Sequence, residues 1–320
     1  MPDSAARAGA PEITVIVPSQ TPGPELAACL AAVAFQVTKR SFEIVVMHSG
    51  RELSEGDLAG IPRVRVEEVD DALLPAAKKN LAAGRSRSRW LAFLDSDCIA
   101  APNWLETLVQ LAELHGVDGV GASIEIGEPK NAVTWPMHML EYGRWLPAAA
   151  SGPTADFATC GAVYRRDSFL GVGGFPDDIF PCCDTILNAK LKAAGHALFF
   201  TSRTSVTHQQ FDDRQKLLAK SCRYGRAYAV AANRYRLPGH RLRGRAAIPV
   251  IMAGRLGRMV VRALAYRPLN ELPYLIRSAV YTVKATYVWS RGVATGPLDP
   301  RESPERQERG APLHVGSAKK

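Results

Sequence analysis

Short runs of apolar residues, each ended by turn-forming or polar residues, recur through the first two thirds of the chain. Their length and their content of Val, Ile and Leu are typical of strands buried on both faces of a sheet. Between them lie longer segments with apolar residues three and four positions apart, the spacing of a helix with one buried face. The expected strands are 13–17, 42–47, 62–69, 90–94, 118–125, 158–164 and 197–200, and the expected helices are 24–37, 75–86, 103–115, 184–194 and 212–234.

This alternation of strands and helices predicts an α/β fold with an open sheet flanked by helices. In such sheets ligands bind beyond the carboxyl ends of the strands. His48 and Asp95 each follow a predicted strand directly, so we expect them near one crevice. Residues 126–157 show no regular period and are expected to be irregular, and 171–181 are a Gly- and Pro-rich loop.

Composition allows a sizeable core and indicates a reducing compartment. The 320 residues suffice for one large domain with an appendage, or for two domains, and 47% of them are hydrophobic. Six cysteines form no C-x-x-C pair and lie among predicted core elements, which favours reduced structural thiols in the cytosol. No apolar leader segment is visible at residues 1–12, and no apolar run reaches the ~18 residues of a spanning helix.

The basic charge of the chain is concentrated near its end. The net charge is +9, but residues 234–291 alone hold twelve Lys or Arg and one acid, so the remainder carries a net −2. Two cationic stripes have helical spacing: Arg255, Arg258 and Arg262 form one, and Arg277, Lys284 and Arg291 form the other.

Apolar helices with a cationic stripe and flanking Trp and Tyr fit an in-plane position at an anionic membrane surface. We therefore expect peripheral association with the cytoplasmic face of the cell membrane. Amphipathic helices packed on the preceding domain are the alternative. Nucleic acid is not expected as a partner, because the aromatic residues lie among aliphatic residues and not among the arginines.

The sharpest chemical signal is Asp95-Ser96-Asp97, directly after the strand WLAFL. Two carboxylates at such a strand end suit a hard divalent cation, Mn²⁺ or Mg²⁺, that is shared with substrate phosphates. The alternative is a solvated turn, in which Asp and Ser are common. The position after a buried strand favours the metal.

Three further groups are candidates. Asp184 begins a predicted helix and is either a general base or an N-cap residue. His208 is either a ligand of the metal or phosphate, or a structural histidine. A basic cluster before and after residue 80 either contacts nucleotide phosphates or is a solvated helix face; it consists of Lys78, Lys79, Arg85, Arg87 and Arg89.

Over residues 11–235 the order of these motifs resembles glycosyltransferase family two, the inverting enzymes with the GT-A fold. The resemblance rests on TVIVPS, FEIVVMHSG, AAKKN, WLAFLDSDCIAAPNWL, TCGAVYRRDSFLGVGGFPDDIF, CDTILNAKLKAAG and SVTHQQ. It implies a nucleotide-sugar donor, a metal on Asp95, Asp97 and His208, and Asp184 as the catalytic base. The residues expected to contact the donor are Pro18, Ser19, His48, Lys78, Asn80, Ser96 and Gly161.

The chain departs from the family pattern at four places. The first strand ends in Pro18-Ser19-Gln20-Thr21, where the family usually has Pro-Thr-Tyr-Asn. His48 and Ser49 stand where the family has paired aspartates, Cys183 replaces the glutamate before the base, and Lys78 and Lys79 replace Ala-Arg. The resemblance implies transfer of a sugar to a lipid-linked or cell-envelope glycan acceptor. The departures leave a catalytically impaired scaffold at the membrane as the alternative. A nucleotidyltransferase is disfavoured, because no basic, Gly-rich phosphate loop follows the first strand.

The expected organisation has four parts. These are a disordered N-terminus at 1–10, a GT-A domain at 11–235, a basic amphipathic helical region at 236–291, and a disordered tail at 292–320.

Overall fold

The computed structural model describes residues 9–297, except 21, 51–52, 54–57, 59–60, 62–63, 238–240 and 267. The predicted disordered segments therefore lie almost wholly outside the described residues. At the boundary one correction is needed, because residues 292–295 form the last turn of a helix and do not belong to a tail.

The centre of the molecule is a mixed sheet in the order β3-β2-β1-β4-β8-β6-β9-β5, with β7 paired to β9. Strands β1, β2, β3 and β4 are parallel to one another, whereas β8 runs antiparallel to both β4 and β6. The predicted open α/β sheet is thus confirmed. The strands are β1 (Ile13–Ser19), β2 (Phe42–His48), β3 (Val64–Glu68), β4 (Trp90–Leu94), β5 (Cys98–Ala100), β6 (Gly119–Ile126), β7 (Gly152–Thr154), β8 (Gly161–Arg165) and β9 (Leu198–His208).

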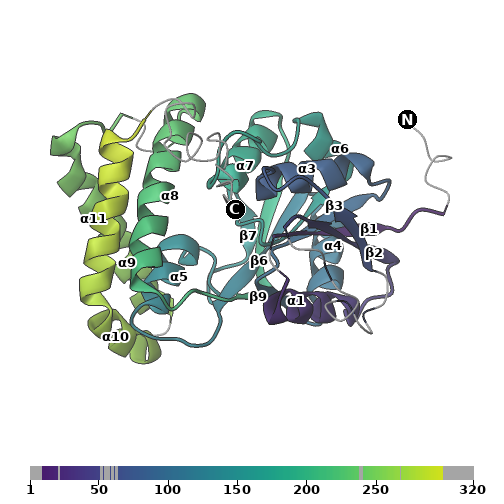
Figure 1. The fold of residues 1–320 in the computed structure, drawn as a ribbon, viewed down its shortest axis with the longest axis horizontal. Coiled ribbons are helices and arrows are strands. Elements are labelled where there is room, and N and C mark those ends of the chain that lie inside the picture. Colours follow the sequence, from purple (N-terminus) through teal and green to yellow (C-terminus); the bar gives the residue numbers. More distant parts are fainter. Residues whose placement is uncertain are drawn as a thin grey trace, which may run out of the picture.

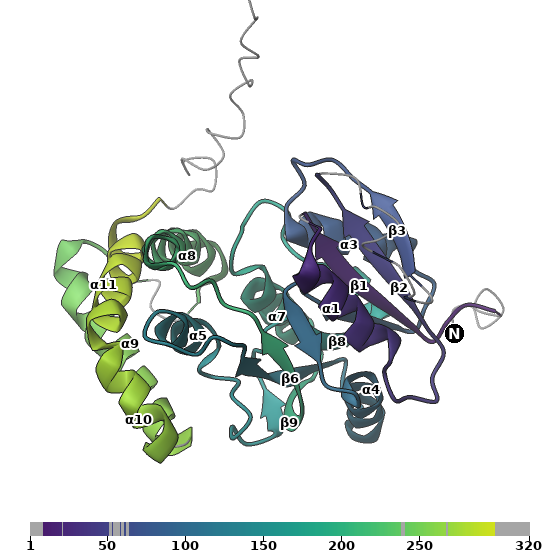
Figure 2. The same cartoon turned by 60° about the horizontal axis from the view of Figure 1, so that its bottom comes forward.

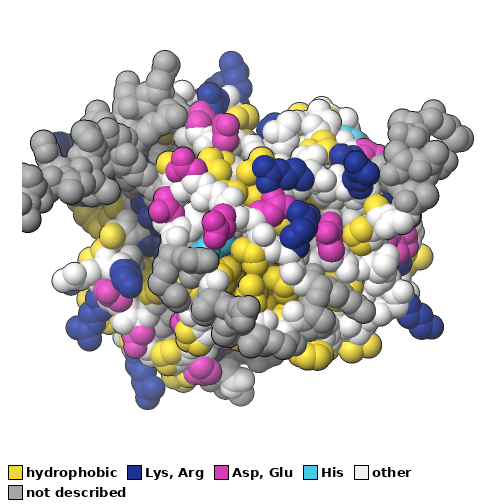
Figure 3. All heavy atoms as spheres, turned by 45° about the vertical axis from the view of Figure 1, so that its right-hand side comes forward, with side chains coloured by type: hydrophobic (Ala, Val, Ile, Leu, Met, Phe, Trp, Pro, Cys, Tyr) yellow, Lys and Arg dark blue, Asp and Glu magenta, His cyan; other side chains and the backbone are white. Residues whose placement is uncertain are grey.

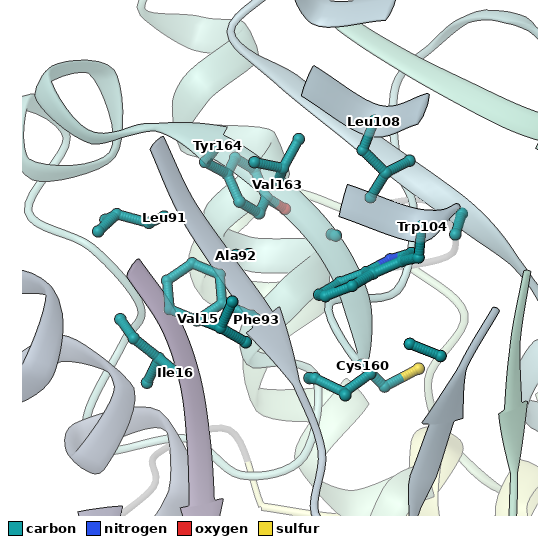
Figure 4. Close-up of a cluster of buried hydrophobic side chains, with 14 of the residues drawn as sticks. Val15, Ile16, Leu91, Ala92, Phe93, Trp104, Leu108, Cys160, Val163 and Tyr164 are labelled. Atoms are coloured by element: carbon teal, nitrogen blue, oxygen red, sulfur yellow. The ribbon is translucent and has the colours of Figure 1, made fainter. Parts of the chain in front are cut away.

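Helices cover both faces of this sheet: Figure 1 shows α3 and α6 on one side, and α1 and α4 on the other. Every residue of β1 and β4 is buried, which explains their uninterrupted apolar sequences. Around them lies the main core, in which Phe93 packs near Tyr164 on one side of the strand (Figure 4). The helices of this part are α1 (Pro24–Ala34), α3 (Pro75–Arg85), α4 (Trp104–His115), α5 (Thr134–Tyr142), α6 (Arg166–Gly171) and α7 (Cys183–Ala193).

Within the described part of residues 11–235, four elements were not expected, namely β5, β7, α5 and α6, and one strand is longer than predicted. Residues 126–157, predicted to be irregular, contain helix α5, which is buried on nearly all sides and so shows no amphipathic period. Its start is fixed by Asn131, whose side-chain oxygen accepts hydrogen bonds from the backbone N–H groups of Val133 and Thr134. The strand predicted at 197–200 continues as β9 to His208.

The last third of the chain forms a helical layer beside the sheet (Figure 2). Helices α8 and α11 approach closely, because Gly225 and Gly292 face each other at the crossing. The same layer contacts α5, where Trp135 packs with Met259. Its helices are α8 (Arg214–Tyr235), the short 3₁₀ turn η2 (Arg245–Ala247), α9 (Ile248–Tyr266), α10 (Pro268–Arg277) and α11 (Ala279–Thr295).

Basic and acidic side chains are intermingled on the face shown in Figure 3, which agrees with the small net charge outside residues 234–291. All six cysteines are free, as predicted. None of the helices described in the structure is long and apolar enough to cross a membrane.

Candidate active site

A cavity of about 1420 Å³ opens at the carboxyl ends of β1 and β4. The sheet forms one wall, and the opposite wall comes from α5, α8 and α9. Most of the residues predicted for the site line it, namely Pro18, Ser19, Lys78, Asp95, Ser96, Asp97, Asp184 and His208. Residues from strands, helices and the last third of the chain thus meet in one place.

The strongest candidate for a metal position lies where β5 pairs with β9. This pairing sets Cys98 opposite His208, so that ligand atoms of Asp97, Cys98 and His208 lie within 4.8 Å of one another. The Nε2 atom of His208 is 3.7 Å from Oδ1 of Asp97. The other ring nitrogen, Nδ1, lies 2.8 Å from the carbonyl oxygen of Gln209. A proton donated from Nδ1 to this carbonyl leaves the Nε2 lone pair facing Asp97, the tautomer that a metal ligand needs.

Cys98 is the poorest ligand of this group. Burial, with a hydrogen bond to Cys160, raises the pKa of its thiol well above the usual value. A thiol that stays protonated binds metal weakly. The residues that fit a hard cation here are therefore the carboxylate of Asp97 and the imidazole of His208.

Asp95 has a different partner. Its Oδ1 atom accepts a hydrogen bond of 2.7 Å from the Nζ of Lys79, which is almost fully buried beside the rings of Phe93 and Phe175. Burial opposes the charge on Lys79, but the Asp95 carboxylate outweighs burial and raises the pKa of the lysine. The ammonium group of Lys79 therefore stays charged and lies next to the carboxylate of Asp95.

Lys78 is also buried in the wall of the cavity. Its Nζ donates hydrogen bonds to the carbonyl of Ser19 (2.7 Å) and to Oγ of Ser49 (2.5 Å), which ties together the ends of β1 and β2. The solvated-face interpretation is therefore wrong for Lys78 and Lys79. Arg85, Arg87 and Arg89 are exposed, as this interpretation expects, but only Arg85 belongs to α3.

Three residues expected to contact the donor do not line the cavity. Both ends of the Asn80 amide bind the backbone of Phe175, at 2.9 Å each, so Asn80 holds the glycine-rich loop and not the donor. Gly161 is packed against Val206, and the residues before it, Ala158 to Cys160, line the cavity instead. His48 is buried at the end of β2, in register with Ser19.

Asp184 lies in the first turn of α7 and lines the cavity. The N-cap interpretation is wrong, because the helix begins at Cys183 and Cys182 precedes it. One carboxylate oxygen accepts the backbone N–H of Thr185 at 2.9 Å. Burial, and then the neighbouring charge of Asp156, raises the pKa of Asp184 to about 6. A carboxylate with this pKa is a stronger base than an ordinary aspartate and is still ionised near neutral pH.

Asp156 is a site residue that the sequence did not reveal. Its carboxylate accepts hydrogen bonds from Asn188 Nδ2 (2.9 Å), Thr185 Oγ1 (3.2 Å) and an Arg144 guanidinium nitrogen (2.8 Å). It thereby fixes α7, the helix that carries Asp184. Asp156 lies in the segment without regular period, and no local pattern distinguishes it from a surface acid.

Known proteins share the fold and part of the sequence. Residues 14–172 match the model of glycosyl transferase family 2. Glycosyltransferase AglE of Haloferax volcanii is 25% identical over 196 residues, which cover 59% of this chain and 64% of the relative. The uncharacterized protein y4gI of Sinorhizobium fredii is 25% identical over 227 residues, covering 63% of this chain and 25% of that one. The matches thus span less than two thirds of either relative.

Among solved structures, the crystal structure of GalNAc-T7 with UDP, GalNAc and Mn²⁺ matches with a TM-score of 0.54 at 13% identity. It covers 71% of this chain and 49% of that one, and the likeness concerns the fold. The architecture is the GT-A fold of nucleotide-sugar transferases. Through residues 14–172, the chain belongs to glycosyltransferase family 2.

Proposed function

We propose that this protein transfers a sugar from a nucleotide-sugar donor to an acceptor hydroxyl, with a divalent cation and with inversion at the sugar. One observation carries the proposal: Asp97, His208 and Asp184 line a single cavity at the carboxyl ends of the strands. The solved structure of GalNAc-T7, which contains UDP and Mn²⁺, supports a nucleotide-bound metal on this fold.

Asp97 and His208 would hold Mn²⁺ or Mg²⁺, with Asp95 next to them. When bound, the cation neutralises charge on the departing nucleotide diphosphate. Lys79 keeps Asp95 oriented through its ion pair. Asp184, which lines the same cavity, takes the proton of the acceptor hydroxyl. The hydroxyl oxygen then forms a bond to the anomeric carbon, and the bond from that carbon to the phosphate oxygen breaks, its electron pair leaving with the diphosphate.

The acceptor is proposed to be a lipid-linked or cell-envelope glycan, reached from the cytoplasmic face of the membrane. Supporting this, the outer surface of α9, α10 and α11 exposes large apolar side chains beside basic residues. Such a surface suits an anionic membrane interface. The apolar residues are Val261, Leu264, Leu272, Ile276, Val280, Val283 and Tyr287, and the basic ones are Arg277, Lys284 and Arg291.

The catalytic part of the proposal is tested by donor hydrolysis across UDP-, GDP- and dTDP-sugars, with and without Mn²⁺. We expect one donor class to be hydrolysed slowly with Mn²⁺ and not with EDTA. Hydrolysis that is equal with and without metal would contradict the role of Asp97 and His208.

A second candidate is a non-catalytic scaffold derived from this family. The observation in its favour is that Cys183 precedes the base and that His48 and Ser49 end β2. Calorimetry with the same nucleotide sugars and Mn²⁺ separates the two functions. A scaffold binds none of them, whereas the transferase binds at least one.

The membrane part is tested by co-sedimentation with vesicles of phosphatidylcholine and phosphatidylglycerol. The double variant Ile276→Ser/Val280→Ser should bind about tenfold more weakly, because two exposed apolar side chains are lost from the contact. Val37→Ser, which changes an equally exposed residue after α1, is the control. Equal binding of the double variant and the control would show that this surface does not meet the membrane.

A further inference from the structure

The three arginines of one α9 stripe face the cavity. Arg255, Arg258 and Arg262 all line it, together with Asp184 and residues of α5. Their spacing of three and four residues places them on one side of α9. This stripe therefore points toward the reaction centre, and only the second stripe, on α10 and α11, belongs to the outer surface.

Six of the other charged residues in the cavity wall form three ion pairs. Asp95 pairs with Lys79, Glu141 with Lys220, and Asp156 with Arg144. In contrast, no carboxylate among the residues described lies at ion-pair distance from Arg255, Arg258 or Arg262. The α9 stripe thus adds three uncompensated positive charges to the cavity.

Contacts with two neighbouring residues fix the position of the Arg255 side chain. Its guanidinium lies 3.9 Å from the ring centre of Trp289 and donates a hydrogen bond of 2.7 Å to the carbonyl of Leu140. Its Nε atom is buried and has no hydrogen-bond partner. Burial, with the neighbouring charges of Arg144 and Arg258, lowers the pKa of Arg255 to about 10, which still leaves it charged at neutral pH. An anion beside the guanidinium groups would relieve the repulsion between these arginines.

Beyond the arginines the cavity becomes apolar. Leu237, Leu242, Val250 and Ile251 continue its wall, and Val250 is 61% exposed although it lies in this wall. Leu242 is 39% exposed as well, so a purely polar ligand would leave Leu242 and Val250 in water. The combination of a cationic stripe and an apolar exit fits a molecule with an anionic head and a hydrocarbon chain.

We propose that the acceptor is an amphiphile with a phosphate ester, whose phosphate is bound by Arg255, Arg258 and Arg262 and whose chain leaves past Val250. The inference rests on the proposed glycosyl transfer, because it places the acceptor hydroxyl at Asp184. Guanidinium groups bind phosphate in a bidentate manner and are the usual choice for this anion. A planar membrane cannot reach Arg255, which is partly buried between α5 and α11.

The test is calorimetric binding of octyl phosphate to the full chain. Octyl glucoside has the same alkyl chain without the anion, and inorganic phosphate has the anion without the chain. Octyl phosphate should bind at least about tenfold more tightly than either, since both parts of the cavity then contribute. Equal binding of octyl phosphate and octyl glucoside would overturn the anion site, and equal binding of octyl phosphate and phosphate would overturn the apolar exit.

Two double variants locate the binding. Arg258→Gln/Arg262→Gln removes two charges from the cavity, and the control Arg87→Gln/Arg203→Gln removes two from exposed positions that belong neither to the cavity wall nor to the proposed membrane surface. The first should weaken octyl phosphate at least about tenfold, and the control should change it less than about twofold. Equal losses of octyl phosphate affinity in both double variants would show that the effect depends only on the total charge of the protein, and would overturn the proposal. Thermal melting confirms that both variants fold.

Measuring nucleotide-sugar binding to the same variants distinguishes an acceptor site from a site for the donor diphosphate. If Arg258→Gln/Arg262→Gln weakens nucleotide-sugar binding and leaves octyl phosphate unchanged, the arginines serve the donor diphosphate and the proposal is wrong. Asp97→Asn should abolish the metal-dependent donor signal and leave octyl phosphate bound. If no nucleotide sugar binds at all while octyl phosphate does, the transferase function fails separately, and the site is an anion site without a role in transfer.

Discussion

Lys79 and Asp95 form an ion pair of 2.7 Å at the floor of the cavity, with the lysine buried and the aspartate about one third exposed. Because of this ion pair, the two carboxylates of Asp95-Ser96-Asp97 have different roles. Asp95 is held by a protein cation, and Asp97 is left to share a metal with His208.

Substitution of Asp97 and substitution of Asp95 should therefore have different effects. Asp97→Asn should weaken Mn²⁺ binding about tenfold or more, because it removes a ligand. Asp95→Asn should have a smaller effect on Mn²⁺ but should lower the free energy of unfolding by about 2 kcal/mol, because it leaves Lys79 buried without a carboxylate. Calorimetry and urea unfolding of both variants measure this contrast. Identical changes in Mn²⁺ affinity and in the free energy of unfolding of the two variants would contradict these different roles.

Transfer activity should depend on the ionisation of Asp184. Its pKa is raised to about 6, and a base acts only when deprotonated, so kcat/KM should fall as the pH drops below 6 and level off above it. Asp184→Asn should reduce transfer by about 10²–10⁴-fold. Asp177→Asn, which changes an exposed carboxylate in the preceding loop, should leave both rate and pH profile unchanged. A profile without a limb near pH 6 would exclude Asp184 as the base.

Asp156 should tune this base and support its helix. Replacing it with Asn removes the charge that contributes to the raised pKa of Asp184, so the acidic limb should move to lower pH. The ion pair with Arg144 is also lost, which should reduce stability by about 1 kcal/mol. Asp178→Asn breaks the exposed pair with Arg234 and should not move the limb. A lower melting temperature with an unmoved limb would make Asp156 structural only.

The contact of α8 with α11 requires glycine. A Cβ atom at Gly225 would lie 2.2 Å from the carbonyl oxygen of Trp289, so Gly225→Ala must separate the two helices. We expect it to destabilise the fold by about 1–3 kcal/mol, as overpacking does. Gly257→Ala is the matched control in α9, because a Cβ there meets nothing within 4 Å and alanine favours the helix by up to about 1 kcal/mol. Urea unfolding should show opposite signs for the two.

Local pattern located the long central strands of the sheet and the Asp95-Ser96-Asp97 part of the site, but not the three-residue strands β5 and β7. Strands β1, β2 and β4 could be located because a strand buried on both faces needs an unbroken apolar run. The end of such a run fixes Asp95 and Asp97 at the sheet edge. In contrast, α5 was missed because a helix buried on most sides loses the amphipathic period that reveals helices.

The partners of charged residues were decided by the tertiary structure. The sequence showed that Lys78 and Lys79 lie on one helix, but only the packing of α3 beside β1 buries them at the strand ends. It showed that Arg255, Arg258 and Arg262 share a helix face, because that follows from 3.6 residues per turn. What the face meets depends on contacts of α9 with α11 and with α5, and the contact with α5 joins residues 115 positions apart, Arg255 and Leu140. Helical periodicity is a local property, whereas the direction of a helix face is set by long-range packing.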